Sequence, residues 1–292
     1  MTAVSAPRGA TSAPSSGLEG VMAVLRKLYL FTFLRGWAVW FSYRAQVLLT
    51  VLGWVIPVFF YFVLAGYLTN PSSGSQFAGS PSSYVAYFVV GLAFQGFVTS
   101  LYGTLAQRIR SEQMMGTLEH LLLSPTTPGA VLLYSMVFSL MLNLLAMGLI
   151  LGIGVGLLGV HLVINWPALW VSGVFLVVSN LGMAILASSF ILWTKQGNPV
   201  AVFLTLYTEL FGGVFFPVTY LPRSVSWISY LVPLNFGLAA VRASLLDGVG
   251  LGGVLGDLGW MALYTVVTIP LGLGFFRWTL KKVREDGTLA TY

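Results

Sequence analysis

The sequence contains no cysteine and only two histidines, His120 and His161. The absence of cysteine excludes a disulfide framework, a thiol nucleophile and any cysteine-based metal site. Two histidines leave little for a histidine-based site, so we expect no metal centre. Charged residues are also scarce: they make up 8% of the 292 residues, whereas a soluble domain carries roughly a quarter.

The scarcity of charge is concentrated in two long stretches. No charged residue lies between Arg44 and Arg108, or between Glu119 and Lys195. Stretches of this kind could not form the surface of a water-soluble globule, so a soluble enzyme is excluded. The net charge of +6 does not indicate a nucleic-acid partner, because the bases sit at the ends of apolar runs, where membrane topology places them.

The apolar residues, 57% of the chain, predict an all-α polytopic membrane protein. A helix needs about 20 apolar residues to cross the hydrocarbon core, and six segments satisfy this. The predicted spans are 45–68, 84–106, 129–159, 168–193, 199–216 and 255–278. They form a permease domain over 21–285. The flanking cytoplasmic tails would be 1–20, which is rich in Ser, Ala, Pro and Gly and is predicted to be disordered, and 286–292.

The lysines and arginines predict the orientation of the spans. With a cytoplasmic N-terminus, all of the 14 basic residues except Arg223 and Arg242 fall in inside segments. The positive-inside rule therefore places both termini on the cytoplasmic side of the membrane, which we expect to be a bacterial-type cell membrane.

The stretch 21–35 before the first span has an apolar stripe, with Arg26 and Lys27 off it. This pattern predicts a helix lying in the cytoplasmic interface, its bases near anionic headgroups of membrane lipids. The helix could serve as an anchor alone, or as an anchor that also contacts a partner.

A second amphipathic stretch follows the second span. Its apolar stripe contains Met114, Met115, Leu118, Leu121 and Leu122, and its opposite face contains Glu112, Gln113, Gly116, Glu119 and His120. We expect a short cytoplasmic helix over 112–124 that offers its carboxylates to a basic partner. An ordinary solvated loop helix would show the same pattern.

The stretch 217–247 is too apolar for a free loop, yet Pro217, Pro222 and Pro233 interrupt any continuous span. Irregular backbone at membrane depth is tolerated only under cover of protein or along a cavity. The pattern predicts a re-entrant helical hairpin in the outer leaflet, with Arg223 and Arg242 near the outer headgroups.

Two strings within these stretches resemble the type-2 ABC exporter permease family, whose members export drugs, polysaccharides or lipids. The first is Glu112 followed by GTLEHLLLSP (116–125); the second is GGVFFPVTYLP (212–222) leading into YLVPLNFGLAAVR (230–242). Together, in a six-span frame over about 20–285, they are fairly specific to that family.

The resemblance implies a dimer of permease subunits, identical or homologous, each bound to a separate ABC ATPase subunit. The segment 112–124 would be the coupling helix. Contacts with the ATPase would come from Glu112, Gly116, Thr117, Glu119, His120 and, in the loop 194–198, Lys195. ATP and Mg would bind in the partner. The sequence agrees, because none of the four lysines is preceded by Gly or followed by Ser or Thr, as a P-loop requires.

Glu209 is the acidic residue placed well inside a predicted span, which makes it a functional candidate. It could be a proton or cation site in the translocation path, or a carboxyl that is neutral or hydrogen-bonded to the re-entrant segment.

Other residues of the spans have expected structural roles. Phe215 and Phe216 are candidates for an outer gate, and Gly212-Gly213 for a break in the fifth helix. Asn143 and Asn180 are expected to form interhelical hydrogen bonds, and Gly148, Gly152 and Gly156 to form a close-packing face.

We therefore expect an export permease, not an enzyme, that binds no cofactor itself and moves amphipathic, drug-like or lipid-linked substrates. An ion-coupled secondary carrier is the alternative, although it predicts inverted repeats and several intramembrane ionisable groups. A membrane-embedded enzyme would need a catalytic constellation, which the sequence does not show.

Overall fold

The computed structural model describes residues 26, 29, 37–68, 81–114, 128–194 and 199–285. Within these ranges the regular elements are helices, and no strand occurs. In chain order they are α2 (Ala38–Ser42), α3 (Arg44–Leu68), α4 (Pro81–Met114), α6 (Pro128–Gly156), α7 (Trp166–Thr194), α8 (Pro199–Phe211), the 3-10 helix η3 (Val218–Tyr220), α9 (Arg223–Ser226), the 3-10 helix η4 (Trp227–Leu231), α10 (Pro233–Leu246) and α11 (Leu251–Glu285).

Proline marks where several of these helices begin. α4, α6, α8 and α10 each have proline as their first residue. This position suits proline, because the first helical N–H has no partner within the helix and the fixed φ of proline is already helical. Proline therefore fixes where these four helices begin.

Five of the described helices, α3, α4, α6, α7 and α11, are long and apolar enough to cross a membrane, and the number rises to six if a bent helix pair is counted as one span. The chain is therefore a multi-pass membrane protein. The predicted span 199–216 is wrong as a single spanning helix. α8 has 13 residues and a length of about 20 Å, against about 30 Å for the hydrocarbon core.

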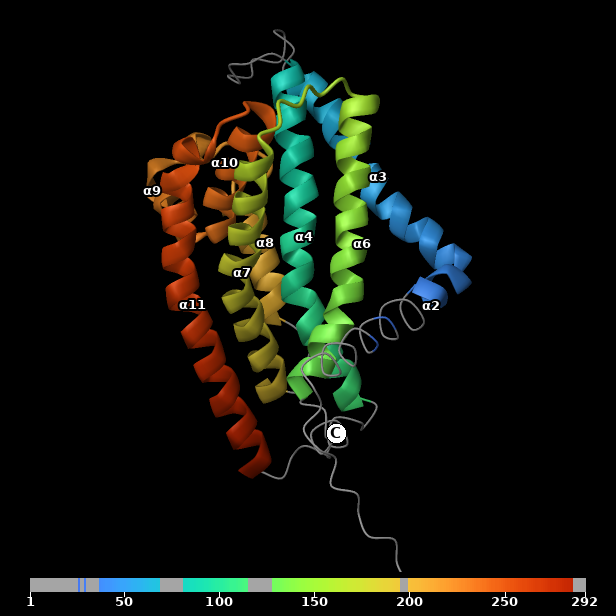
Figure 1. Ribbon diagram of the computed structural model, residues 1–292, viewed down its shortest axis with the longest axis vertical. Helices are drawn as coiled ribbons and strands as arrows, with labels where there is room; N and C mark the ends of the chain where they lie inside the picture. Colours follow the sequence, from blue (N-terminus) through green and yellow to red (C-terminus); the bar gives the residue numbers. More distant parts are fainter. Residues whose placement is uncertain are drawn as a thin grey trace, which may run out of the picture.

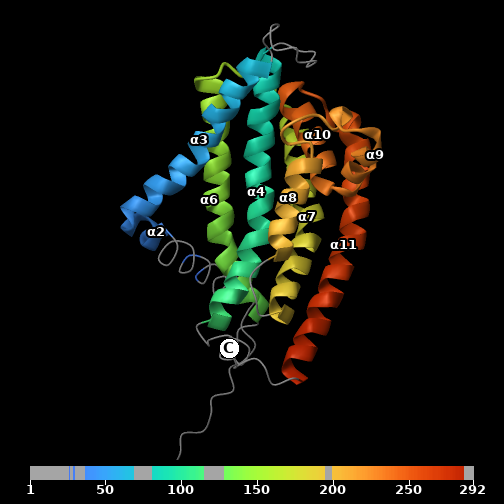
Figure 2. The same cartoon turned by 180° about the vertical axis from the view of Figure 1, so that it is seen from behind.

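The bent pair occupies the stretch predicted as a helical hairpin. Its two arms, Arg223–Leu231 and Pro233–Leu246, meet at an angle of 82°. In both views the pair lies at one end of the bundle, beside the start of α11 and the start of α7 (Figures 1 and 2). We call this the hairpin end. The opposite end holds Met114, the last residue of α4, and Glu285, the last residue of α11.

The core of the bundle lies between α4, α7 and α10. Its fully buried side chains include Val98 and Tyr102 of α4, Leu176 of α7, and Leu234 and Leu238 of α10. α11 packs chiefly against α7. Small residues allow this close approach, because a Cβ added to Gly272 would lie 2.8 Å from the carbonyl oxygen of Gly182.

α3 differs from the other long helices in leaning away from the bundle (Figure 1). Large apolar side chains are exposed along it, among them Leu49, Ile56, Phe60 and Val63. Val58, by contrast, is buried. In the single chain α3 thus offers apolar surface on most of its circumference.

Two expectations about packing are wrong. The side-chain amide of Asn143 donates to the Ser139 carbonyl of its own helix at 2.7 Å, not across helices. Cβ atoms added to Gly148, Gly152 and Gly156 would meet nothing within 4 Å, so these glycines form no close contact with the part of the chain that the structure describes. The close approach of α6 to α4 occurs instead at Gly154, where an added Cβ would lie 2.6 Å from Cγ1 of Val89.

Candidate functional site at the broken end of helix α8

The chain leaves the helical path directly after α8. The helix ends at Phe211, and the N–H of Gly212 still donates to the Thr208 carbonyl at 2.9 Å. Gly213 then adopts a φ of +67°, a left-handed conformation that favours glycine. Helical structure resumes only at Val218. The break predicted from Gly212-Gly213 is confirmed.

The break leaves backbone carbonyls without helical partners, and side chains from two other helices bind them. Nη1 of Arg242 donates to the Gly213 oxygen at 2.9 Å, and Nη2 donates to the Val214 oxygen at 3.3 Å. The hydroxyl of Tyr87 donates to the Gly213 oxygen at 2.7 Å, and that of Tyr84 to the Phe215 oxygen at 3.1 Å. These donors replace the hydrogen bonds that a helix end loses.

Arg242 reaches the break from α10 and lies inside the protein. Its exposed fraction is 9%, so the expectation that it sits near the outer headgroups is wrong. Nη2 also donates to the Tyr87 carbonyl at 3.1 Å, and the guanidinium carbon lies 3.4 Å from the centroid of the Tyr87 ring. Tyr87 thus binds the arginine through its ring as well as its backbone.

A glycine on α4 makes room for this arrangement. A Cβ added to Gly91 would lie 2.6 Å from Nη2 of Arg242 and 2.6 Å from the carbonyl oxygen of Val214. Glycine therefore lets the arginine and the broken backbone press directly against α4. We call Arg242, Tyr87 and Gly91, with the carbonyls of Gly213 and Val214, the arginine clamp.

Glu209 lies on α8, before the break, and its partner comes from α4. Nε2 of Gln95 donates to Oε1 of Glu209 at 2.6 Å. Gln95 is buried and Glu209 is half-buried. The hydrogen bond expected to the hairpin segment is therefore made to the second predicted span instead. The amide of Gln95 thus supplies a hydrogen-bond donor to this carboxyl from a neighbouring helix.

The predicted gate residues follow the break. Phe215 stacks on Tyr61 of α3, with ring centroids 5.0 Å apart, and Tyr61 in turn stacks on Phe88 of α4 at 4.8 Å. Phe215 therefore joins the broken segment to both α3 and α4. Phe216 is half-buried.

Of the residues predicted to contact an ATPase, only Glu112 lies in the part of the chain that the structure describes. Glu112 belongs to the last turn of α4, which continues as one helix to Met114, so the helix expected over 112–124 does not begin as a separate element. Arg26 is exposed. Lys27, predicted with Arg26 for the interface helix, lies outside the described residues. So do the other predicted ATPase contacts: Gly116, Thr117, Glu119, His120 and Lys195.

The sequence did not single out Tyr84, Tyr87, Gly91 or Gln95. A signal for them existed, since these four positions recur at spacings of three and four along α4 and so share one side of the helix. Asn180 was identified correctly, because its Oδ1 accepts a hydrogen bond from the hydroxyl of Tyr102 on α4.

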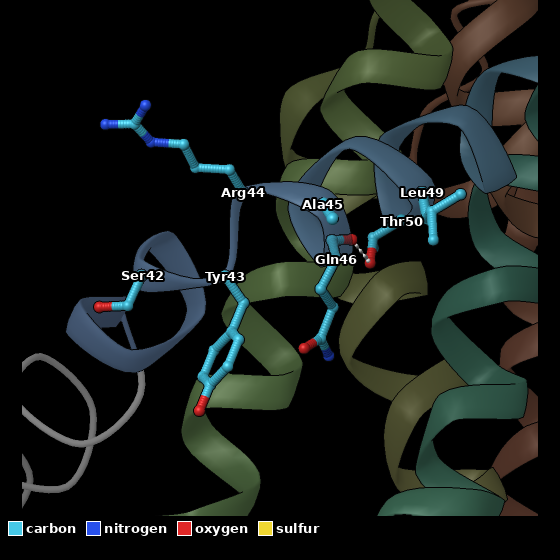
Figure 3. Close-up of a pocket in the computed structure, with 7 residues that line it drawn as sticks. All are labelled: Ser42, Tyr43, Arg44, Ala45, Gln46, Leu49 and Thr50. Carbon is cyan, nitrogen blue, oxygen red and sulfur yellow. Dashed lines mark hydrogen bonds between the residues drawn. The ribbon is translucent and has the colours of Figure 1, made fainter.

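A separate pocket of about 680 Å³ opens at the junction of α2 and α3. It is lined by Ser42, Tyr43, Arg44, Ala45, Gln46, Leu49 and Thr50. The guanidinium of Arg44 points away from it, and Thr50 bonds to the backbone of Gln46 (Figure 3). No predicted site residue lines the pocket.

Within the described ranges, no group of three His, Cys, Asp or Glu residues could hold a metal ion.

The comparisons with known proteins agree with this architecture. The family model described as ABC-2 type transporter matches residues 25–246, a stretch that includes the broken helix and the arginine clamp. No curated protein matches the chain. Because the family model covers most of the sequence and the helices are those of a multi-pass membrane protein, the chain belongs to the ABC-2 type transporter family and is an ABC-type permease, the transport subunit.

Proposed function

We propose that the chain is the membrane subunit of an ATP-driven exporter. Two copies, or one copy and a homologous chain, would enclose a path across the cell membrane, and each would bind a separate ATPase subunit. The family match over 25–246 is the observation that carries this proposal. The absence of a P-loop lysine from the sequence supports the division of labour.

The path would run beside α4 and α8. Glu209 supports this placement, because a half-buried carboxyl is costly against lipid and is expected to face a partner subunit or a water-filled space. Phe215 and Phe216 would close the path at the hairpin end, which the distribution of basic residues assigns to the outside. Apolar walls with few charges suit amphipathic, drug-like or lipid-linked cargo.

The opposite end would face the cytoplasm and receive the ATPase. The segment 112–124 begins in the last turn of α4, which ends at Met114, and Glu112, Gly116, Thr117, Glu119, His120 and Lys195 would touch the partner. ATP binding there favours a closed arrangement of the ATPase subunits, and that difference in affinity shifts the membrane helices.

The test is mass spectrometry of the intact complex purified from the native membrane, followed by efflux of a fluorescent amphipathic dye from vesicles containing that complex. We expect two permease chains with two ATPase subunits, and dye movement that requires ATP. A chain that purifies without an ATPase subunit, and moves the dye along a proton gradient alone, would establish a secondary carrier instead.

A further inference from the structure

The hairpin carries two arginines in opposite environments. Arg223 is exposed at the start of α9, whereas Arg242 is buried on α10. A buried cation within the membrane domain is expensive, so Arg242 requires compensation that Arg223 does not.

The position of the break explains what Arg242 compensates. α8 is about 20 Å long, shorter than the roughly 30 Å hydrocarbon core, and Gly213 and Val214 after its end are buried in the protein, so their carbonyls are shielded from water. Each would be strongly destabilising there without a donor. Arg242 and Tyr87 supply those donors, at 2.7–3.3 Å.

The compensation is mutual. Among the described residues, no carboxylate lies within ion-pair distance of Arg242. Its charge is balanced by backbone carbonyls at the negative end of the α8 dipole and by the ring of Tyr87. Moving the broken segment away from α4 would deprive the arginine and the carbonyls of their partners at the same time. The contact therefore favours one position of the segment.

That position also fixes Phe215. The residue follows the clamped carbonyls directly, and its ring rests on Tyr61 while Tyr84 binds its carbonyl. We propose that Arg242 is the positioning residue that keeps the segment from Gly213 to Phe215 against α4 and so holds the gate closed at the hairpin end. This inference rests on the proposed role of Phe215 and Phe216 as the gate.

The test uses the natural absence of cysteine. A single cysteine replaces Phe216, and its rate of reaction with a membrane-impermeant maleimide is measured on the full chain in membrane vesicles. A cysteine at Leu157, whose side chain is 71% exposed, provides the reference for full accessibility. The measurement needs neither the ATPase subunit nor a substrate, so its outcome is independent of whether the chain exports anything.

Arg242→Met should raise the labelling rate at position 216 by about tenfold, because hydrogen bonds from a charged donor are strong. Arg242→Lys should give an intermediate rate, since lysine keeps the charge but not the planar fork or the ring stacking. Tyr87→Phe keeps the ring and removes one donor, so it should raise the rate by about threefold. The matched control, Arg223→Met, should leave the rate unchanged.

Labelling at the parent rate in Arg242→Met would overturn the proposal. If that variant cannot be recovered from the membrane, Arg242→Lys and Tyr87→Phe decide the question: parent rates in both would overturn it. An equal rise in Arg223→Met would also overturn it, because general loosening of the hairpin would then explain the labelling.

Discussion

Gln95 of α4 and Glu209 of α8 are joined by a hydrogen bond of 2.6 Å between Nε2 and Oε1, although 113 residues separate them in the sequence. The bond ties the short helix to the second spanning helix before α8 breaks. Gln95 is thus the described partner of Glu209, the acidic side chain that the sequence marks as a functional candidate.

We expect Gln95→Leu to lower the free energy of unfolding by about 1–3 kcal/mol, because the Glu209 carboxyl would lose its donor in a poorly solvated place. Thermal unfolding of the purified protein in detergent measures this loss. Gln46→Leu, at an exposed position, is the control and should leave the midpoint unchanged. An unchanged midpoint in Gln95→Leu would show that the bond does not stabilise the fold.

Gly91→Ala should destabilise the protein by about 1–3 kcal/mol, because its methyl group would overlap the guanidinium of Arg242 and the carbonyl of Val214 in a packed interior. Gly96→Ala on the same helix meets nothing within 4 Å and should be neutral, or stabilising by up to about 1 kcal/mol. Both melting temperatures are compared with that of the parent. Equal effects of the two substitutions would contradict the tight contact at Gly91.

The glycines of α6 offer a similar comparison. Gly154→Ala should destabilise the fold by about 1–3 kcal/mol through overlap with Val89, whereas Gly152→Ala, which faces open space, should not. The measurement is thermal unfolding of the protein in detergent at concentrations that keep it monomeric. If Gly152→Ala alone destabilises, the stripe predicted from the sequence would be the packing face after all.

The proposed coupling segment is tested with Glu119→Arg. A reversed charge should repel a basic surface on the ATPase subunit, so we expect at least a tenfold loss of co-purified ATPase, which corresponds to about 1.4 kcal/mol. Quantitative mass spectrometry of the complex measures it. Glu285→Arg, exposed at the end of α11, is the control for charge alone. Normal ATPase recovery with Glu119→Arg would remove Glu119 from the contact.

The proposed orientation predicts the reactivity of two single cysteines in intact cells. A cysteine at Leu157, between α6 and α7, should react with an impermeant maleimide from outside. One replacing Glu285 should react only after the membrane is opened. The reverse pattern would invert the topology and place the hairpin end inside.

The helices and the break were predictable because they depend on local chemistry. Long apolar stretches give the spanning helices, prolines begin several of them, and Gly212-Gly213 ends α8. The length of α8 was overestimated, because the apolar residues Val214–Phe216 continue the hydropathy pattern after the helix has ended.

The contacts between helices were less predictable, since periodicity shows which residues share a face but not what that face meets. The sequence predicts that Arg242 faces outward, because the carbonyls that bind it, after the end of α8, lie about 30 residues earlier in the chain. The bond of Asn143 was also misjudged. An amide in an apolar span needs an acceptor, and periodicity does not show that a backbone carbonyl one turn away supplies it.

The packing of α7 against α11 has a consequence for synthesis. α7 is made well before α11, yet Gly182 and its neighbours are shaped to receive the last helix. While the ribosome adds the hairpin, that surface of α7 still lacks the helix that covers it in the folded chain. The bundle therefore closes late in translation, and a nascent chain that stops before Leu251 leaves uncovered the surface of α7 against which α11 packs.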